Sequence, residues 1–316
     1  MNHWEMENAV HLGVALKEAS FQVSQICCSR PSCFDFAARK EETIILVKVN
    51  SDVDTFSPQS ARELKVIAGR VSAASLVISQ QAHGKPLEED TVYSRNAVFV
   101  VTEKTIRNIA LQTANPLVYA APGGYSVEVD GELVAKRRKE LDLSIGKLAA
   151  MIGVSRRTLY GYERGMAKAS VKSAYKLAET LGVPVAKPIN VLKRTQKQRQ
   201  CLLIKAQHAI TGKALLQKVF RKFAFCDISP VYRAPFDFIM NTPNNRDVIV
   251  GGVAVNGERN LDKRIEEITS VCNVIRARPV LITEKTKIFS KDMYCICIEE
   301  LSAMRTPEDL VATATA

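Results

Sequence analysis

The sequence predicts a multidomain protein of mixed class, in which a central all-α domain lies between two repeated α/β domains. Three observations predict this architecture. Apolar residues recur at helical spacing in the middle of the chain, and on both sides of it runs of β-branched residues alternate with amphipathic helices. The order of these flanking elements is the same in both halves. A length of 316 residues with 47% hydrophobic content is enough for two or three buried cores.

The composition of the segments sets the expected domain boundaries. These are residues 1–120 for the first α/β domain, 121–192 for the helical domain, 193–214 for a basic helical linker, 215–306 for the second α/β domain and 307–316 for a tail.

The two α/β domains repeat one pattern. A helix leads to a strand with an aspartate, then to a second strand, an amphipathic helix and a third strand. Asp35 in CFDFAAR aligns with Asp237 in PFDFIMN, and the strand VKVN at 47–50 aligns with VAVN at 253–256. Each copy is therefore expected to form a sheet covered by helices.

A turn signal separates the first copy from the helical domain. Pro122, Gly123 and Gly124 precede the alternating segment YSVEV, which reads as a short strand. We expect a hairpin or hinge at this point. The alternative is a joint that responds to a ligand.

The helical domain contains two short helices joined by a tight turn between Leu143 and Gly165. Ser144 and Ser155 can cap these helices, and Gly153 supplies a turn that most residues resist. A side chain at the start of the second helix can reach base edges in the major groove of DNA, where arginine binds guanine. The residues expected to face outward there are Ser155, Arg156, Arg157, Thr158 and Tyr160.

A further helix should follow at 170–181, with Val171, Ala174, Tyr175, Ala178 and Leu181 as its core face.

Positive charge is concentrated in the same part of the chain. Residues 130–200 contain about sixteen Lys and Arg but about six Asp and Glu, whereas the first 129 residues sum to about −2. Local basicity of this kind is typical of phosphate binding, although a solvated helix face is the alternative. The residues expected to bind phosphates are Arg137, Arg138, Lys147 and Arg164.

The pattern LxxxxLAxxxGVSxxTLxxYERG, followed by KLAETLGV, resembles the Cro and lambda-repressor family of helix-turn-helix domains. The resemblance covers residues 130–192 and implies binding to double-stranded DNA. One such domain covers only a few base pairs, so we expect a homodimer on a two-fold site, with the duplicated α/β domains as its surface. Ile145 stands where many members of that family have glutamine, which leaves base reading to the second helix. A helical bundle used only for protein contacts is the alternative.

The α/β copies resemble the PD-(D/E)xK nuclease-like fold of restriction endonucleases and Holliday junction resolvases. In active members an aspartate and a carboxylate two residues before a lysine hold a divalent metal. Asp35 and Lys48 fit two of these positions, but Leu46 stands where the second carboxylate would be. In the second copy Asp237 remains and Ala254 aligns with Lys48. The resemblance therefore implies degenerate sites without a metal.

Two alternatives to a non-catalytic DNA reader stay open. The first is a metal-dependent nuclease or resolvase-like enzyme that recruits Glu18 or Glu63 as the missing ligand. The second is a DNA-anchored interaction hub whose α/β domains bind the transcription machinery or a small effector.

The whole chain resembles an archaeal family of HTH-type transcriptional regulators. The segments FDFAAR, VYSRNAVFVVTE and GGYSVEVDGELVAKRR carry this resemblance together with the helix-turn-helix pattern. It implies sequence-specific DNA binding and control of transcription, with no cofactor and no enzymatic activity.

Targeting signals and cysteine spacing complete the expectations. No apolar run reaches the roughly 18 residues of a membrane span, and the N-terminus lacks a signal-peptide pattern, so we expect a cytoplasmic protein without a membrane partner. The eight cysteines lack paired C-x-x-C spacing, which predicts neither a zinc site nor a disulfide framework.

Overall fold

The computed structural model describes residues 2–121, 123–195, 214–224, 226–242, 247–255, 258–284, 293–304, 306 and 309–312. The chain forms two compact units, which are residues 1–78 with 192–316 (unit 1) and residues 79–191 (unit 2). Most of the expected basic linker, at 196–213, and most of the tail lie outside the described residues. The linker was expected to be helical from residue 193, but residues 193–195 are not helical.

Unit 1 begins with an N-terminal subdomain, residues 2–78, whose strands follow the order β1-β2-β3-β4. Phe36 in β2 lies opposite Val47 in the antiparallel neighbour β3, and both are fully buried. The strand β4 runs across the boundary into unit 2. The elements are α1 (His3–Glu18), β1 (Gln22–Val23), β2 (Phe36–Lys40), β3 (Thr43–Asp52), a 3-10 turn η1 (Val53–Thr55), α2 (Pro58–Arg70) and β4 (Ala74–Ala82).

The rest of unit 1 forms a C-terminal subdomain, residues 214–312, with a five-stranded sheet in the order β11-β12-β13-β14-β15. Phe238 in β12 lies opposite Gly251 in the antiparallel strand β13. Its elements are α9 (Ala214–Lys222), β11 (Asp227–Pro230), β12 (Phe238–Asn241), β13 (Val248–Ala254), α10 (Leu261–Ile275), β14 (Arg278–Thr283), β15 (Tyr294–Cys297), α11 (Ile298–Ala303) and α12 (Asp309–Ala312).

Hydrogen bonds show that the two subdomains place their aspartates alike. The Asp35 N–H donates to the Val47 carbonyl at 2.7 Å, and the Asp237 N–H donates to the Gly251 carbonyl at 2.8 Å. Val47 therefore corresponds to Gly251, and Lys48 to Gly252. The alignment of VKVN with VAVN, which matched Lys48 to Ala254, is wrong by two residues, because similar β-branched letters recur along this strand and only the ladder fixes the register.

The subdomains contact each other reciprocally. Glu63 in α2 accepts hydrogen bonds from the N–H groups of Tyr232 and Arg233, at 3.1 and 2.8 Å. In the same way Glu267 in α10 accepts from the N–H groups of Cys28 and Ser29, at 2.9 and 2.8 Å.

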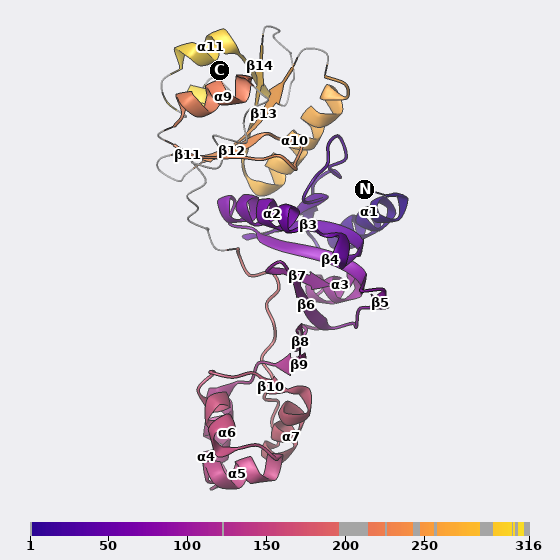
Figure 1. Ribbon diagram of the computed structural model, residues 1–316, viewed down its shortest axis with the longest axis vertical. Coiled ribbons are helices and arrows are strands. Elements are labelled where there is room, and N and C mark those ends of the chain that lie inside the picture. Colours follow the sequence, from indigo (N-terminus) through magenta and orange to yellow (C-terminus); the bar gives the residue numbers. More distant parts are fainter. Residues whose placement is uncertain are drawn as a thin grey trace. The chain divides into compact units, whose positions relative to one another are not determined.

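Whole helices also contact the opposite subdomain. The helix α10 packs on β2 and α2 packs on β12. The rings of Phe34 and Phe236 lie 6.3 Å apart at their centroids. Figure 1 shows α10 reaching down to the N-terminal subdomain. Reciprocal contacts of this kind characterise an isologous dimer interface, here formed within one chain.

Unit 2 starts with strands and one helix and continues into the helical domain. The predicted hairpin is confirmed: β8 and β9 are antiparallel, and Gly123 and Gly124 at the turn have φ angles of 107° and 118°. Pro122 lies outside the described residues. The strands of this unit follow the order β7-β6-β8-β9-β10. The elements before the helical domain are β5 (Lys85–Pro86), β6 (Thr91–Arg95), β7 (Val98–Val101), α3 (Glu103–Ala110), β8 (Val118–Ala121) and β9 (Gly124–Val127).

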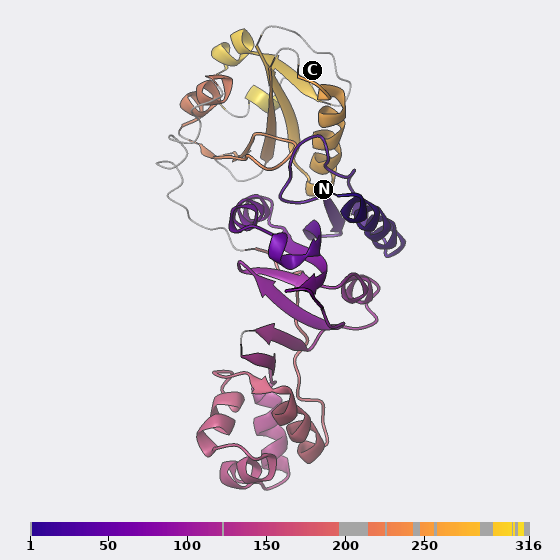
Figure 2. The ribbon, with the colours of Figure 1, turned by 45° about the vertical axis from the view of Figure 1, so that its right-hand side comes forward.

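The helical domain consists of four helices and one short strand. Figures 1 and 2 show these helices, in magenta and pink, as one bundle. Their bounds are α4 (Gly131–Glu140), α5 (Ile145–Ile152), α6 (Arg156–Glu163), β10 (Ala169–Ser170) and α7 (Val171–Leu181). The strand β10, which the sequence did not predict, pairs with β9. Within the described residues, no helix has the length and apolar character needed to cross a membrane.

The expected caps are confirmed, but part of one core face is wrong. Ser144 and Ser155 accept the N–H of Lys147 and Thr158 at 3.1 and 3.0 Å, and Gly153 adopts a φ of 75°. In α7 the buried stripe runs through Ala174, Leu177 and Leu181. Val171 and Tyr175 were expected in the core but are 43% and 69% exposed, because they lie beside this stripe instead of on it.

Replacing Glu267 with alanine should weaken the contact between the two subdomains. The change leaves the N–H groups of Cys28 and Ser29 without their acceptor, which should cost about 2 to 3 kcal/mol. Urea unfolding followed by the fluorescence of Trp4, the only tryptophan, measures the loss in the N-terminal subdomain. The neighbouring exposed residue provides the control, since Glu266→Ala should change the free energy by less than about 0.5 kcal/mol. Equal effects of both variants would contradict the assigned role of Glu267.

Candidate nucleic-acid interface

The second helix of the helix-turn-helix is α6. The side chains in its first turn were predicted to face outward, and most of them are exposed. Leu159 and Tyr162 are buried on its inner side. Arg156 and Arg157 are exposed, and Tyr160 is 45% exposed. Thr158 is half-buried, and its hydroxyl bonds that of Ser155 at 2.8 Å. The hydroxyl of Ser155 is thus engaged as the helix cap, and the long exposed side chains are the ones that extend furthest from this surface.

Two of the expected phosphate-binding residues lie elsewhere in the bundle. Arg138 is buried and forms a bidentate pair with Glu163, with Nε–Oε1 at 2.6 Å and Nη2–Oε2 at 3.1 Å. It also donates to the Leu143 carbonyl. Arg137 donates to the Leu181 carbonyl at the end of α7 and to Glu140. Arg138 therefore holds α4 to α6 and to the following turn, so its charge is already satisfied inside the protein.

The other two expected residues are exposed. Lys147 lies in the first turn of α5, and Arg164 caps the end of α6 with its guanidinium 5.5 Å from the centre of the Tyr160 ring. Lys172, in the first turn of α7, was not predicted although it is exposed as well. Its position two residues after the cap Ser170 is a sequence signal that could have identified it.

Three of the four helices in the helical domain, α5, α6 and α7, begin with basic side chains. The helices α5, α6 and α7 have no acidic residue in the first turn and carry Lys147, Arg156 with Arg157, and Lys172 there. By contrast, α1, α3 and the first helix of the bundle, α4, have an acidic residue in the first turn. The N-terminus of a helix carries partial positive charge, so basic side chains there are unfavourable in the isolated protein. An anionic partner such as a phosphate backbone removes this cost.

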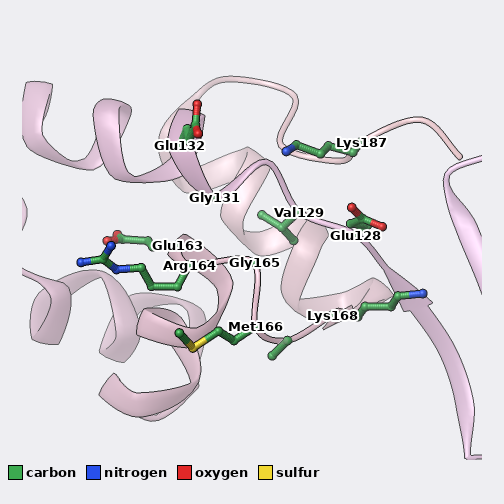
Figure 3. A pocket seen from close by; sticks show the side chains of 11 residues that line it. Glu128, Val129, Gly131, Glu132, Glu163, Arg164, Gly165, Met166, Lys168 and Lys187 are labelled. Atoms are coloured by element: carbon green, nitrogen blue, oxygen red, sulfur yellow. The ribbon is translucent and has the colours of Figure 1, made fainter.

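A pocket of about 390 Å³ lies beside the end of α6. Figure 3 shows Glu163 and Arg164 on one side of it and Glu128 and Lys168 on the other. The Lys168 ammonium lies 3.4 Å from the centre of the Tyr119 ring. This contact joins the segment after α6 to β8 of the hairpin. Both acidic and basic side chains line the pocket, and the carboxylate of Glu163 is already paired with Arg138.

In unit 1 both carboxylate oxygens of Asp35, the nuclease-like position, accept hydrogen bonds from groups of the protein itself. The Lys48 ammonium donates to Oδ1 of Asp35 at 2.7 Å, and the Val49 N–H donates to Oδ2 at 2.6 Å. Burial raises the pKa of Asp35 above its usual value, although the charge and hydrogen bond of Lys48 act against this. Leu46 is fully buried and offers no ligand.

Neither carboxylate considered as a replacement for that ligand serves Asp35. Glu18 is exposed at the end of α1, and Glu63 binds backbone N–H groups of the C-terminal subdomain. The negative charge that does act on Asp35 is that of Glu5, which the sequence reasoning missed because α1 brings it there from 30 residues away. Among the residues that the structure describes, no group of three His, Cys, Asp or Glu side chains could hold a metal ion.

At the equivalent position in the C-terminal subdomain, two arginines surround Asp237. The Val253 N–H donates to Asp237 at 2.7 Å, as Val49 does to Asp35. Arg264 from α10 pairs with Asp237 and donates to the Val253 carbonyl. A Cβ at Gly252, the counterpart of Lys48, would lie 3.4 Å from Nη2 of Arg264. The nearest atoms to that Cβ would be Cδ1 of Leu281 at 3.0 Å and Cδ1 of Ile268 at 3.1 Å, so apolar side chains limit the space at Gly252, and the cation beside Asp237 comes from the helix.

The second arginine comes from the other subdomain. Arg30 donates to Asp237 at 3.0 Å and to Glu258 at 2.7 Å, and Glu258 also accepts from Arg264. Asp237 thus belongs to a network of two arginines and two carboxylates that joins the subdomains. Such a network neutralises the charge on which divalent metal binding would depend.

Comparisons with known proteins agree with the two fold types. The model of the PD-(D/E)XK superfamily domain matches residues 7–116, and the helix-turn-helix model matches residues 134–187. A crystal structure of the restriction-modification controller protein C.AhdI from Aeromonas hydrophila is 32% identical over 17% of this chain and 80% of its own, with a TM-score of 0.16.

Several archaeal proteins match almost the full chain. A protein of Natronomonas pharaonis is 34% identical over 88% of this chain and 87% of its own length. Similar proteins occur in Haloarcula marismortui, with 32% identity over 86% and 84%, and in Archaeoglobus fulgidus, with 29% identity over 94% and 93%. Each carries the name "Putative HTH-type transcriptional regulatory protein". The chain belongs to this archaeal protein family.

Proposed function

We propose that this protein is a sequence-specific DNA-binding transcriptional regulator that reads double-stranded DNA with the exposed start of α6. The observation that carries the proposal is the placement of basic residues at the starts of three consecutive helices without a neighbouring acidic residue. The names of the archaeal relatives and the helix-turn-helix match support it. Arg157 and Tyr160 are the proposed base-reading side chains, with Arg156 beside them.

The proposed phosphate contacts differ from those expected from sequence alone. Lys147 and Arg164 are retained and Lys172 is added, since all three are exposed around α6. Arg137 and Arg138 are left out because both bond groups within the bundle. One reader covers only a few base pairs, so a homodimer on an inverted repeat remains part of the proposal. The reciprocal face of the α/β subdomains is occupied within the chain, so the dimer would have to use another surface.

The absence of enzymatic activity is also a proposal. A PD-(D/E)XK domain is present, but Asp35 and Asp237 both bond a cation and a backbone N–H. These carboxylates act as anchors for strands and subdomains and not as metal ligands. An interaction hub is compatible with the same arrangement, and the pocket beside α6 is then the place for a small effector.

Selection of bound duplexes from a random DNA pool tests the reading function. We expect an inverted repeat to be enriched. Arg157→Ala should lose about 1 to 3 kcal/mol of discrimination at one position per half-site, because it removes a base contact. Lys147→Ala should weaken all sequences alike and lower the salt slope by about one unit. Lys104→Ala in α3 is the matched control, and binding that responds equally to all three changes would contradict the assigned surface.

Arg138→Ala should destabilise the bundle instead of acting on DNA directly. Removing this arginine leaves the buried Glu163 carboxylate unpaired, which should cost about 3 kcal/mol. Native-state hydrogen exchange of α4 and α6 in the full chain measures the loss. The adjacent exposed Lys139→Ala should change it by less than about 0.5 kcal/mol. An unchanged exchange rate in Arg138→Ala, together with a lower salt slope, would restore Arg138 as a phosphate contact.

The nuclease alternative predicts cleavage that depends on Asp35. We expect the wild-type protein to leave duplex and four-way-junction DNA intact in magnesium or manganese, because Lys48 and Val49 already occupy the Asp35 carboxylate. Gel analysis of product lengths for the wild type and Asp35→Asn makes the comparison. A product formed by the wild type and lost in Asp35→Asn would establish the enzyme.

A further inference from the structure

The guanidinium of Arg156 folds back over the first helix of the helix-turn-helix. Gly146 is the second residue of α5, and Arg156 is the first residue of α6. A Cβ built on Gly146 would lie 2.7 Å from Nε of Arg156 and 3.0 Å from its Cζ and Nη2. Real Cβ atoms do not approach other heavy atoms so closely, so this path of the side chain requires glycine at position 146.

Arg156 and its neighbour are therefore not equivalent. Consecutive residues of an α-helix point about 100° apart, so Arg156 can lie against α5 while Arg157 points elsewhere. Arg156 is exposed where it lies along α5, so a partner could reach its guanidinium.

The surroundings of Arg156 suit a phosphate and not a base edge. The next residue along α5 from Gly146 is the exposed Lys147, and neither α5 nor α6 has an acidic residue in its first turn. Ile145, at the start of α5, provides no polar side chain that could direct Arg156 toward a base. A guanidinium beside an ammonium at the start of a helix matches the charge of a sugar-phosphate backbone.

We infer that Gly146 is a positioning residue that acts through Arg156. By lacking a Cβ, it keeps Arg156 across the first turn of α5 as a contact to the DNA backbone and leaves base reading at this end of α6 to Arg157. The inference rests on the proposed DNA-reading function. It also assigns Arg156, which the sequence placed among the base readers, to a different role.

A double-mutant cycle in the full-length protein tests this inference. Wild type, Gly146→Ala, Arg156→Ala and the double variant are compared by affinity for the selected duplex, affinity for a scrambled duplex, salt slope and the sequence preference recovered from a random pool. Gly161→Ala is the matched control, since it also adds a methyl group to a reader helix but meets only Ala167 at 3.5 Å. Thermal unfolding of each variant checks that the bundle remains folded.

Arg156→Ala should weaken both duplexes by the same factor, lower the salt slope by about one unit and leave the preferred sequence unchanged. Gly146→Ala should displace Arg156, so that the wild-type backbone contact is lost or a new preference arises at one position per half-site. In the Arg156→Ala background the same alanine should change affinity by less than about twofold, because its effect passes through Arg156. Gly161→Ala should behave as the wild type.

Two results would overturn the inference. A changed base preference with an unchanged salt slope in Arg156→Ala would make Arg156 a base reader. An equal effect of Gly146→Ala with and without Arg156 would show that Gly146 acts through α5 itself. Binding of the wild type without any sequence preference would defeat the proposed function alone, since the salt slopes would still test the backbone contact. No DNA binding by the wild type would defeat both.

Discussion

A buried carboxylate must be met by a cation or by N–H donors, and the two units depend on this constraint. Asp35 and Asp237 each tie one strand to the next through a backbone N–H and a cation. Glu267 ties the N-terminal subdomain to the C-terminal one, and Glu163 ties α6 to α4 through Arg138. Because an unpaired buried charge costs several kcal/mol, each partner fixes where its neighbouring element can lie.

The same constraint describes how the two aspartates of the α/β subdomains are held. A metal site needs carboxylates whose charge is available to the ion. Here the protein supplies the cations. Asp35 is paired with Lys48 from a strand of its own subdomain. Asp237 is paired with Arg264 from α10 and with Arg30 from a loop of the N-terminal subdomain. The ion pair between Asp237 and Arg30 is therefore also a contact between the two subdomains. The two subdomains thus hold their aspartates in the same way while taking the cation from different elements.

The sequence predicted well those features that depend on neighbouring residues. Serine caps, the turn at Gly153 and the glycine hairpin are set within a few residues, so they could be read directly. Long-range partners could not be read in this way. The structural role of Arg138 could not be predicted, because its partner Glu163 lies 25 positions away in the sequence. The pairing register of β13 could not be predicted either, because it is set by the neighbouring strand β12. The fold types were thus accessible from the sequence, whereas the division of the arginines into structural and exposed ones was not.

That division changes how the charge of the reader should be understood. Net charge alone treats every lysine and arginine as equal, but Arg138 is neutralised inside the bundle and Arg137 supports the end of α7. Part of the charge that remains exposed lies at the starts of α5, α6 and α7, where it adds to the partial positive charge of each helix, and Arg164 is exposed at the end of α6. These sites therefore form a discrete set of positive points on a rigid bundle. Discrete points fix the register of a protein on the regularly spaced phosphates of a duplex, and only in a fixed register could Arg157, the proposed base reader, meet the same base pair each time.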